Sequence, residues 1–271
     1  MSQYFSGKVV IITGSSMGIG KALAIHLCSH NARVVLNARN EEKLTSTKDE
    51  LAARGMEVVA FAGDVTNDEV AKNLIQFAIN SFGRIDVLVN NAGTSMRGRI
   101  ETVNPDVVRD IYEVNTISPL VLSRYAMPFV KESKGHIIFI SSLAGLRGLP
   151  LISIYSSAKM ALTSLADALR VEHQSDHIHI GIVYVGITEV EQGKNTVGAD
   201  GELIPLDPRS GFYVASTEQV AVAIGNNIRN RKKKTVIGIV GKAFYFLNRY
   251  LPFVLEFAIK RSYKKSQKLY N

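Results

Sequence analysis

The stretch Lys8–Gly20, K-V-V-I-I-T-G-S-S-M-G-I-G, decides the fold of this 271-residue chain. Its first half is a β-branched apolar run without alternation, which predicts a strand covered on both faces. Glycines follow at Gly14, Gly18 and Gly20, and apolar residues then recur at helical spacing as far as Cys28. Strand, glycine-rich turn and helix in this order predict that the turn holds a pyrophosphate at the helix N-terminus. The alternative is a plain strand-to-helix turn.

The same alternation of strand and helix continues along the chain, and no linker or internal repeat divides it. Strands joined by helices pair in parallel, so the pattern predicts an α/β fold with a doubly wound sheet and helices on both faces. The expected strands are Lys8–Thr13, Arg33–Asn37, Val58–Ala62, Ile85–Val89, His136–Ser141, Ile178–Val185 and Thr235–Val240. The expected helices include Glu41–Arg54, Asp106–Phe129 (interrupted near Pro119 and Pro128), Tyr155–Glu172 and Thr217–Arg229.

The net charge of +8 is unevenly distributed. From Ile228 to Asn271 there are twelve Lys or Arg residues against the single acidic Glu256, which leaves 20 basic and 23 acidic residues for the rest. Basicity is thus a property of the C-terminus, and without a base-stacking surface it predicts no nucleic-acid partner. The single Cys28 and the lack of a signal-like or spanning apolar segment lead us to expect a cytoplasmic protein.

The end of the second expected strand indicates which dinucleotide the turn would bind. An acidic residue here takes the ribose hydroxyls of NAD, but this chain has Asn37 and Arg39. A carboxylate would repel a 2′-phosphate, whereas a guanidinium binds one through two hydrogen bonds. The pattern favours NADP(H), with Arg39 as a mere surface charge being the alternative.

Tyr155 and Lys159 stand four residues apart in a segment that predicts the start of a helix. Residues at this spacing share one helical face, so we expect the ammonium to lower the phenol pKa from its usual value of about 10. Such a tyrosine gives or takes a proton near neutral pH. Ser142 follows an expected strand upstream, and Asn115 lies inside an expected helix, where asparagine is a mediocre residue. Alone, the Tyr–Lys pair is a common feature of helix surfaces.

Five signals occur together in order: T-G-S-S-M-G-I-G at 13–20, N-N-A-G at 90–93, Asn115, Ser142, and Y-S-S-A-K at 155–159. Over roughly residues 5–240 the chain resembles the short-chain dehydrogenase/reductase family. The resemblance implies a single-domain Rossmann fold with a mostly parallel seven-stranded sheet. It also implies hydride exchange between a nicotinamide cofactor and a carbonyl or alcohol carbon.

The resemblance further implies residue roles. Tyr155 would be the general acid in reduction and the base in oxidation, and Lys159 would lower its pKa and hold the nicotinamide ribose. Ser142 would hydrogen-bond the substrate oxygen, and Asn115 would retain a water linked to Lys159. The cofactor-binding positions carried over are Gly14, Ser16, Met17, Gly18, Ile19, Gly20, Asn37, Arg39, Asp64, Val65, Asn90, Ala92, Gly93, Tyr155, Lys159, Gly186, Ile187 and Thr188. No metal site is expected.

The chain departs from the family pattern in two places. Many NADP-using members carry a basic residue where this chain has Met17, so the preference rests on Arg39 with help from Asn37 and Asn40. The family often has Pro-Gly after the sixth strand and a threonine four residues beyond that glycine. Here Val185 precedes Gly186, and the nearby threonine is Thr188.

We divide the chain into a nucleotide-binding and catalytic body (1–241), with a substrate loop at 186–215, and a basic amphipathic extension (242–271). The segment Ala243–Ile259 is apolar and aromatic but too short and too polar to span a bilayer comfortably. An aromatic helix flanked by lysines favours binding to an anionic membrane surface, such as the inner membrane face. Packing on the body, on the substrate cleft or on a second subunit is an equal alternative.

The substrate is the least determined feature. Leucines near the site (Leu143, Leu146, Leu149 and Leu151) predict an apolar substrate. A 3-oxoacyl thioester is one candidate, and a steroid- or sphingoid-type ketone at a membrane is another. A non-catalytic nucleotide-sensing protein is a third reading, which the intact catalytic positions disfavour. The resemblance also predicts a homodimer or homotetramer.

Overall fold

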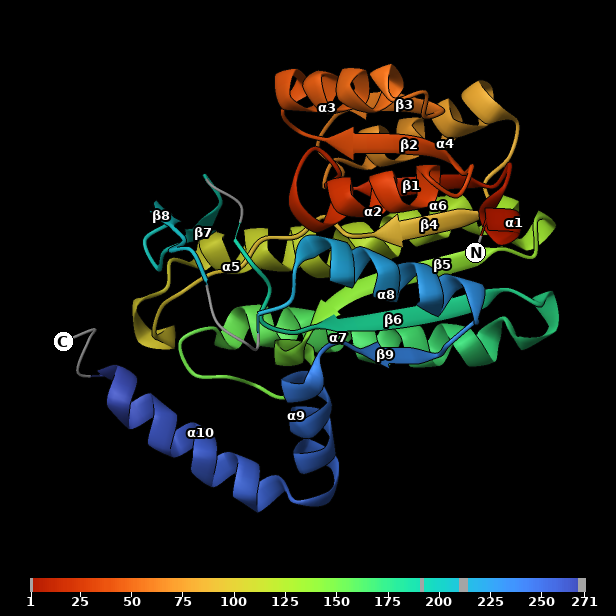
Figure 1. The fold of residues 1–271 in the computed structure, drawn as a ribbon. Helices are drawn as coiled ribbons and strands as arrows, with labels where there is room; N and C mark the ends of the chain where they lie inside the picture. The colour runs from red at the N-terminus through yellow and green to blue at the C-terminus, as the bar shows by residue number, and fades with distance from the viewer. Residues whose placement is uncertain (1, 191–192, 210–213, 268–271) are drawn as a thin grey trace.

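The computed structural model describes residues 2–190, 193–209 and 214–267, and seven parallel strands form its central sheet. The strand order is β3-β2-β1-β4-β5-β6-β9, and the arrows of these seven strands point the same way in Figure 1. The strands are β1 (Val9–Thr13), β2 (Arg33–Ala38), β3 (Val58–Ala62), β4 (Val87–Asn90), β5 (His136–Ser142), β6 (His179–Val185) and β9 (Lys234–Val236). This confirms the predicted doubly wound α/β fold.

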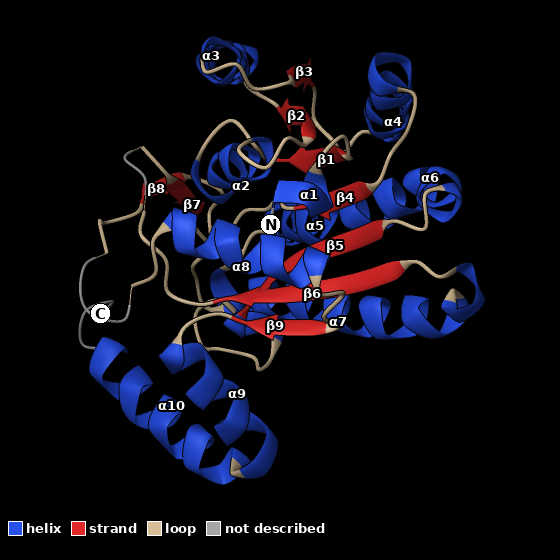
Figure 2. Ribbon diagram, turned by 45° about the vertical axis from the view of Figure 1, so that its right-hand side comes forward, coloured by secondary structure: helices blue, strands red, loops and turns tan. Residues whose placement is uncertain are grey.

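Helices cover both faces of the sheet (Figure 2). One face packs on α2 (Gly18–Cys28), α3 (Glu41–Ala53) and α8 (Thr217–Arg229), and the other on α4 (Asp68–Phe82), α6 (Ser118–Glu132) and α7 (Ser153–Glu172). The remaining helices are α1 (Ser2–Phe5), α5 (Pro105–Tyr112), α9 (Ile239–Tyr250) and α10 (Pro252–Gln267). Two layers of helices leave no strand face open to solvent at the centre of the sheet.

The unbroken apolar run of β1 follows from this burial. Val10 and Ile12 belong to the core on the α2 and α8 side, while Val9 and Ile11 belong to the core on the α4 and α7 side. All four side chains are completely buried. A strand covered on both faces needs an apolar residue at every position, because successive side chains point to opposite faces.

Two predicted elements end at other residues than expected. The long helix expected over 106–129 is α5 and α6 joined by a π-helical turn at Glu113–Ile117, and α6 continues through Pro128. The expected last strand Thr235–Val240 stops at Val236, since Gly238 has a φ of +78° and α9 begins at Ile239. The predicted division between 241 and 242 therefore falls inside a helix.

The segment 189–215, which shows no period in the sequence, contains an antiparallel hairpin of β7 (Asn195–Val197) and β8 (Leu203–Pro205). Val197 forms a bridge to Met96, so the hairpin packs beside the loop that follows β4. The extension expected as one helix over 243–259 is two helices, α9 and α10, which meet at Leu251–Pro252. Proline lacks the N–H that a continuous helix would need there.

Buried histidines close the end of the sheet opposite the glycine turn. Nε2 of His179 lies 3.0 Å from the carbonyl oxygen of Lys232, so it carries the proton. Nδ1 of His179 then accepts from Nδ1 of His136 at 3.0 Å, and Nε2 of His136 accepts from the Tyr4 hydroxyl at 2.8 Å. Every ring nitrogen is satisfied when both imidazoles are neutral, and burial lowers the pKa of His136 to about 2 and that of His179 to about 4.

This chain of hydrogen bonds predicts acid-sensitive stability. Both pKa values lie below the unfolded value of about 6.5, so the unfolded chain takes up protons first and stability falls as pH drops below about 6.5. The loss should approach roughly 1.4 kcal/mol per pH unit for each histidine until the folded pKa is reached. Urea unfolding at about pH 7.5 and about pH 5 measures it.

The matched variants for that measurement are His179→Gln and His177→Asn. The first removes a buried imidazole and should flatten the pH dependence, although the protein is less stable throughout. The second removes an exposed imidazole, at a φ of +56° that asparagine tolerates, and should leave the dependence unchanged. Equal pH dependence in the wild type and His179→Gln would contradict the assignment.

Candidate active site

The glycine turn packs directly against the loop after β4, at the carboxyl edge of the sheet. Gly14 has a φ of +64°, and a Cβ on it would lie 2.9 Å from the Cα of Ala92. A Cβ on Gly20 would lie 2.3 Å from the carbonyl oxygen of Gly14, so that glycine lets α2 approach its own turn. Open doubly wound sheets bind ligands where the strand order reverses, which here is between β1 and β4.

Thr13 and Asn91 hold the two turns together; both stand in the motifs quoted above, although neither is among the individual cofactor-binding positions carried over. Oγ1 of Thr13 accepts from the backbone N–H groups of Asn91 and Ala92 at 3.0 and 2.9 Å. The Asn91 amide donates to the carbonyl oxygens of Thr13 and Gly14 at 2.9 and 3.0 Å. A hydroxyl at the last position of a buried strand, and a second asparagine after β4, are the sequence signals that mark them.

Arg39 is the exposed cation of the predicted 2′-phosphate site. Its side chain is 75% exposed and lies 3.5 Å from Oδ2 of Asp64, at the end of β3. Burial alone would raise the pKa of Asp64, but hydrogen bonds from Thr66 and the Arg39 charge hold it below its usual range. The guanidinium and the carboxylate therefore share the edge where an adenosine ribose would lie in a fold of this type.

Asn37 and Asn40 are held by the protein itself. The Asn37 amide is buried and donates to the carbonyl oxygens of Phe61 and Gly63 at 3.0 and 3.2 Å. The Asn40 side chain caps α3 by accepting from the backbone N–H of Lys43. These contacts give both side chains a part in the fold, and their contribution beside Arg39 stays a prediction.

Other predicted cofactor positions differ in how they contact the rest of the protein. Val65 is buried in the core, and Ile19 packs on the other core cluster. Asn90 is buried, its amide donates to Ser123 at 3.2 Å, and its Oδ1 has no protein partner. The Ser16 carbonyl accepts from Thr47 at 2.9 Å, and Met17 precedes α2 without a side-chain cap.

The predicted substrate-side positions follow β6. Thr188 is buried, its hydroxyl points back to the Gly186 carbonyl at 3.4 Å, and it forms a bridge to Ala215. Ile187 is 47% exposed and offers an apolar surface. A Cβ added to Gly186 would lie 3.6 Å from a methyl group of Leu143. This strand end therefore adjoins the residue that follows Ser142.

The structure brings the predicted catalytic side chains together from three elements. Ser142 ends β5 and lies close enough to Tyr155, in the first turn of α7, to affect the pKa of that phenol. One turn further on, Lys159 is only 5% exposed, with Nζ 5.9 Å from the centroid of the Tyr155 ring. Nζ donates to the carbonyl oxygen of Ile140 at 3.0 Å. Burial lowers the pKa of Lys159 to about 8.

The expected lowering of the Tyr155 pKa by Lys159 is wrong for this structure. Burial raises the pKa of Tyr155, and the Ser142 hydrogen bond and the Arg209 charge oppose that rise without cancelling it. The Lys159 ammonium lies over the Tyr155 ring, 5.9 Å from its centroid, and donates to the Ile140 carbonyl, and its charge is not among the causes that shift the Tyr155 pKa. Helical spacing placed the two residues on one face, but tertiary contacts set the direction of the lysine.

Asn115 lies in the π-helical turn and is completely buried. Its amide donates to the carbonyl oxygens of Thr94 and Ile111 at 2.8 and 2.9 Å, which leaves Oδ1 without a protein partner. A Cβ on Gly93 would lie 2.7 Å from that oxygen and 3.1 Å from Nζ of Lys159. An unpaired acceptor and a buried ammonium thus flank the same glycine, as a bound water between them would require.

These features define a nucleotide-binding α/β protein with a tyrosine–lysine–serine site at the carboxyl edge of its sheet. Within the described part of the chain, no group of three or more His, Cys, Asp or Glu residues is placed to hold a metal ion. Residues 8–200 match the sequence profile of the short chain dehydrogenase family. The chain belongs to this family and is an oxidoreductase of it.

Similar proteins cover most of the chain. It is 32% identical over 272 residues to 11-beta-hydroxysteroid dehydrogenase 1A of Arabidopsis thaliana, covering 97% of this chain and 77% of that protein. A metagenomic short-chain oxidoreductase in complex with NADP is 28% identical with a TM-score of 0.72, over 88% of this chain and 98% of that one. A Burkholderia phymatum enzyme in complex with NAD is 25% identical with a TM-score of 0.75, over 85% and 88%.

The Gly14 contact predicts that Gly14→Ala abolishes dinucleotide binding. The added methyl would press on Ala92 and displace the loop that Thr13 and Asn91 hold. Gly55→Ala is the matched control, because Gly55 has a similar φ of +73° with nothing within 4 Å of an added Cβ. Both variants should lose roughly 1 kcal/mol to backbone strain. Fluorescence titration with NADPH should separate them, and equal affinities would contradict a role for the packed turn.

Proposed function

We propose that the protein interconverts a carbonyl and a secondary alcohol with NADP(H), using Tyr155 as general acid and base. The observation that carries this proposal is that Ser142 and Tyr155 lie side by side, close enough for Ser142 to affect the pKa of the Tyr155 phenol, with the buried Lys159 beneath them. Two neighbouring hydroxyls can both donate to one substrate oxygen. The non-catalytic alternative would need Lys159 to hold a ribose, but it gives no chemical reason to keep Asn115, Ser142 and Tyr155 beside it.

The proposed roles of the side chains follow from the charge that develops on the substrate oxygen. In reduction the substrate oxygen becomes negative, so the Ser142 hydroxyl stabilises it by donation while the Tyr155 hydroxyl supplies the proton. Lys159 would restore that proton through a water between Nζ and Oδ1 of Asn115, next to Gly93. A bound nicotinamide cofactor supplies the hydride in reduction and accepts it in oxidation. The raised Tyr155 pKa suits an acid that stays protonated until hydride transfer.

The residues at the carboxyl edge fit such a cofactor. The turn from Gly14 to Gly20 lets backbone approach a pyrophosphate, and α2 turns its positive dipole end toward that turn. Arg39 supports the preference for NADP(H), because its exposed guanidinium stands where a 2′-phosphate would need a cation. Asp64 partly neutralises it, and among similar structures both NADP and NAD complexes occur.

For the substrate we propose a lipid-like carbonyl compound such as a 3-oxoacyl thioester. Half-buried Leu143 and Leu146 follow Ser142, and exposed Ile187 faces the same end of the sheet. A steroid- or sphingoid-type ketone is the second candidate, which the name of the Arabidopsis thaliana relative favours. Both have an apolar body and a ketone carbonyl that the hydroxyls of Ser142 and Tyr155 would bind.

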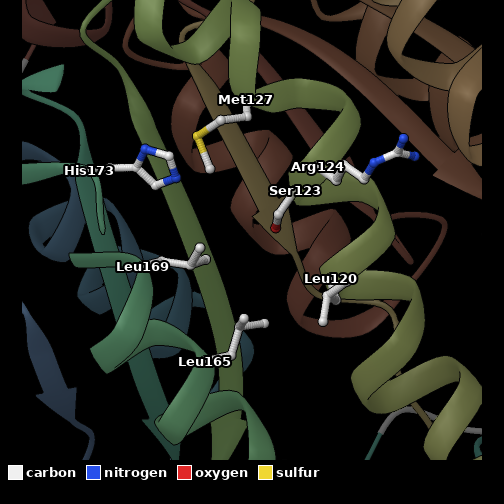
Figure 3. Close-up of a pocket in the computed structure, with 7 residues that line it drawn as sticks. All are labelled: Leu120, Ser123, Arg124, Met127, Leu165, Leu169 and His173. Atoms are coloured by element: carbon white, nitrogen blue, oxygen red, sulfur yellow. The ribbon is translucent and has the colours of Figure 1, made fainter. Parts of the chain in front are cut away.

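We propose a homodimer or homotetramer that works in the cytoplasm, in part at an anionic membrane surface. An apolar groove of about 290 Å³ supports the assembly, and it lies between α6 and α7 (Figure 3). It lies away from the catalytic residues and is lined by Leu120, Ser123, Arg124, Met127, Leu165, Leu169 and His173. A second copy would cover these leucines.

The first test is Tyr155→Phe. Loss of the hydroxyl should remove nearly all turnover while NADPH binding stays measurable, because the ring and Lys159 remain in place. Tyr112→Phe is the matched control, since that hydroxyl bonds Ser157 on the neighbouring face and should be dispensable. NADPH oxidation is followed with acetoacetyl-CoA, longer 3-oxoacyl thioesters and steroid ketones. Retained turnover in Tyr155→Phe would refute the mechanism.

The second test is Arg39→Asp, which replaces the cation with a carboxylate that repels a 2′-phosphate and accepts from ribose hydroxyls. The ratio of kcat/KM for NADPH over NADH should fall by roughly 10- to 100-fold, since a charge-assisted contact is worth about 1.5–3 kcal/mol. Arg54→Asp, at the far end of α3, makes the same charge change away from the turn. An unchanged ratio in Arg39→Asp would show that Arg39 is only a surface charge.

A further inference from the structure

The two C-terminal helices each bury one side and expose an apolar one. On α10, Leu255 is buried, and Ile259 is half-buried one turn later. The exposed aromatic residues are Phe246, Tyr250, Phe253 and Phe257, each more than half exposed. Phe246 and Tyr250 stand one turn apart on α9, with their rings 5.0 Å apart, and Phe253 and Phe257 stand one turn apart on α10. We refer to these four residues as the aromatic series.

Further apolar and basic side chains surround the aromatic series. Ile239 is 72% exposed at the start of α9, and Val254 is 40% exposed on α10. The basic residues between 239 and 264 are Lys242, Arg249, Lys260, Arg261 and Lys264, all exposed, against the single acidic Glu256. Glu256 forms ion pairs with Arg147 and Lys260, so cations of the same chain already compensate its charge.

The helices attach to the body at the loop that follows Ser142. A Cβ on Gly241 would lie 3.4 Å from a Leu143 methyl, so the first turn of α9 packs against the neighbour of Ser142. The Asn248 amide donates to the Leu146 carbonyl at 2.9 Å. Arg147 donates to Asn248 at 3.4 Å and to Glu256 at 3.2 Å, and so joins both helices to the body. Figures 1 and 2 show α9 and α10 projecting beside the carboxyl end of β9.

We propose that α9 and α10 lie on the surface of an anionic membrane, with the aromatic series inserted at the level of the headgroups. Arg147 then holds that surface beside the substrate end of the active site, so a membrane-dissolved lipid carbonyl enters from the bilayer. This inference rests on the proposed reductase function for its substrate. It does not require a spanning helix, and none among the described residues is long and apolar enough to cross a bilayer.

The charge pattern selects a membrane over a second copy of the chain. Protein–protein interfaces are depleted in lysine, whereas aromatic faces flanked by lysine and arginine suit an anionic headgroup layer. Each exposed cation near such a surface strengthens binding until salt screens it. A second copy would bring the same five cations against each other, and the one carboxylate is already paired.

Co-sedimentation of the full chain with phosphatidylcholine vesicles, with and without phosphatidylserine, tests the surface. Binding should need phosphatidylserine and weaken with added salt. The double variant Phe246→Ser/Phe257→Ser should bind at least about tenfold more weakly, because it loses two inserted rings. Val222→Ser is the control, since Val222 is 40% exposed on α8, away from the aromatic series. Equal pelleting of all three proteins would overturn the proposal.

The second-copy alternative has its own result in the same samples. If the aromatic series is a protein interface, the wild type should self-associate without vesicles and the double variant should not. That result, together with no phosphatidylserine-dependent pelleting, would overturn the membrane proposal. Pelleting needs no catalysis, so the two proposals fail separately. Vesicle binding without any NADPH oxidation would refute only the reductase function and the lipid entry that depends on it.

Arg147→Ala tests whether the membrane surface is coupled to the site. With a long-chain ketone dissolved in the vesicles, anionic vesicles should raise the wild-type rate, and the rise should be largely lost in Arg147→Ala. The same variant should pellet like the wild type and reduce a short water-soluble ketone at an unchanged rate, results that a general folding defect would not produce. An undiminished rise in Arg147→Ala would show that the link does not position the site at the membrane.

Discussion

The pairing of β1 with β4 is the constraint on which the site depends. The chain builds β1, β2 and β3 toward one edge and then returns to place β4 on the other side of β1. That reversal sets the glycine turn after β1 against the loop after β4, where Thr13 and Asn91 hydrogen-bond them together. Without a side chain at Gly14 the two backbones can touch, so one small contact joins both halves of the sheet at the ligand-binding edge.

The second constraint is the burial of Lys159. An ammonium that is 5% exposed must find acceptors, and it finds the Ile140 carbonyl at the end of β5. Gly93 leaves room between this ammonium and the unpaired oxygen of Asn115. The π-helical turn carries Asn115, whose amide donates to the carbonyl oxygen of Ile111 one turn earlier and to that of Thr94 in the loop after β4. The buried ammonium, the missing side chain at Gly93 and the π-helical turn thus bring Nζ of Lys159 and Oδ1 of Asn115 to the same place.

The sequence predicted the strands well where burial was strongest. β1, β5 and β6 are fully or almost fully buried, and their unbroken apolar runs were assigned to within two residues. The prediction failed where contacts between distant parts of the chain overrode the local pattern. Ile237–Val240 looks like strand because it is β-branched, but Gly238 turns the chain and the α9 residue Gly241 packs on Leu143. Pro128 signalled a break, yet α6 continues through it.

The sequence alone determined the fold class, the family and the four candidate catalytic positions. Glycine spacing, buried apolar runs and ordered motifs are properties of neighbouring residues, and short-range chemistry sets them. Only the tertiary structure decided which way Lys159 points, that Asn37 serves the fold, that Thr13 and Asn91 join the turns, and that Arg147 ties the C-terminal helices to the loop after Ser142. Each of these is a contact across distant parts of the chain, and its direction depends on packing that no local pattern encodes.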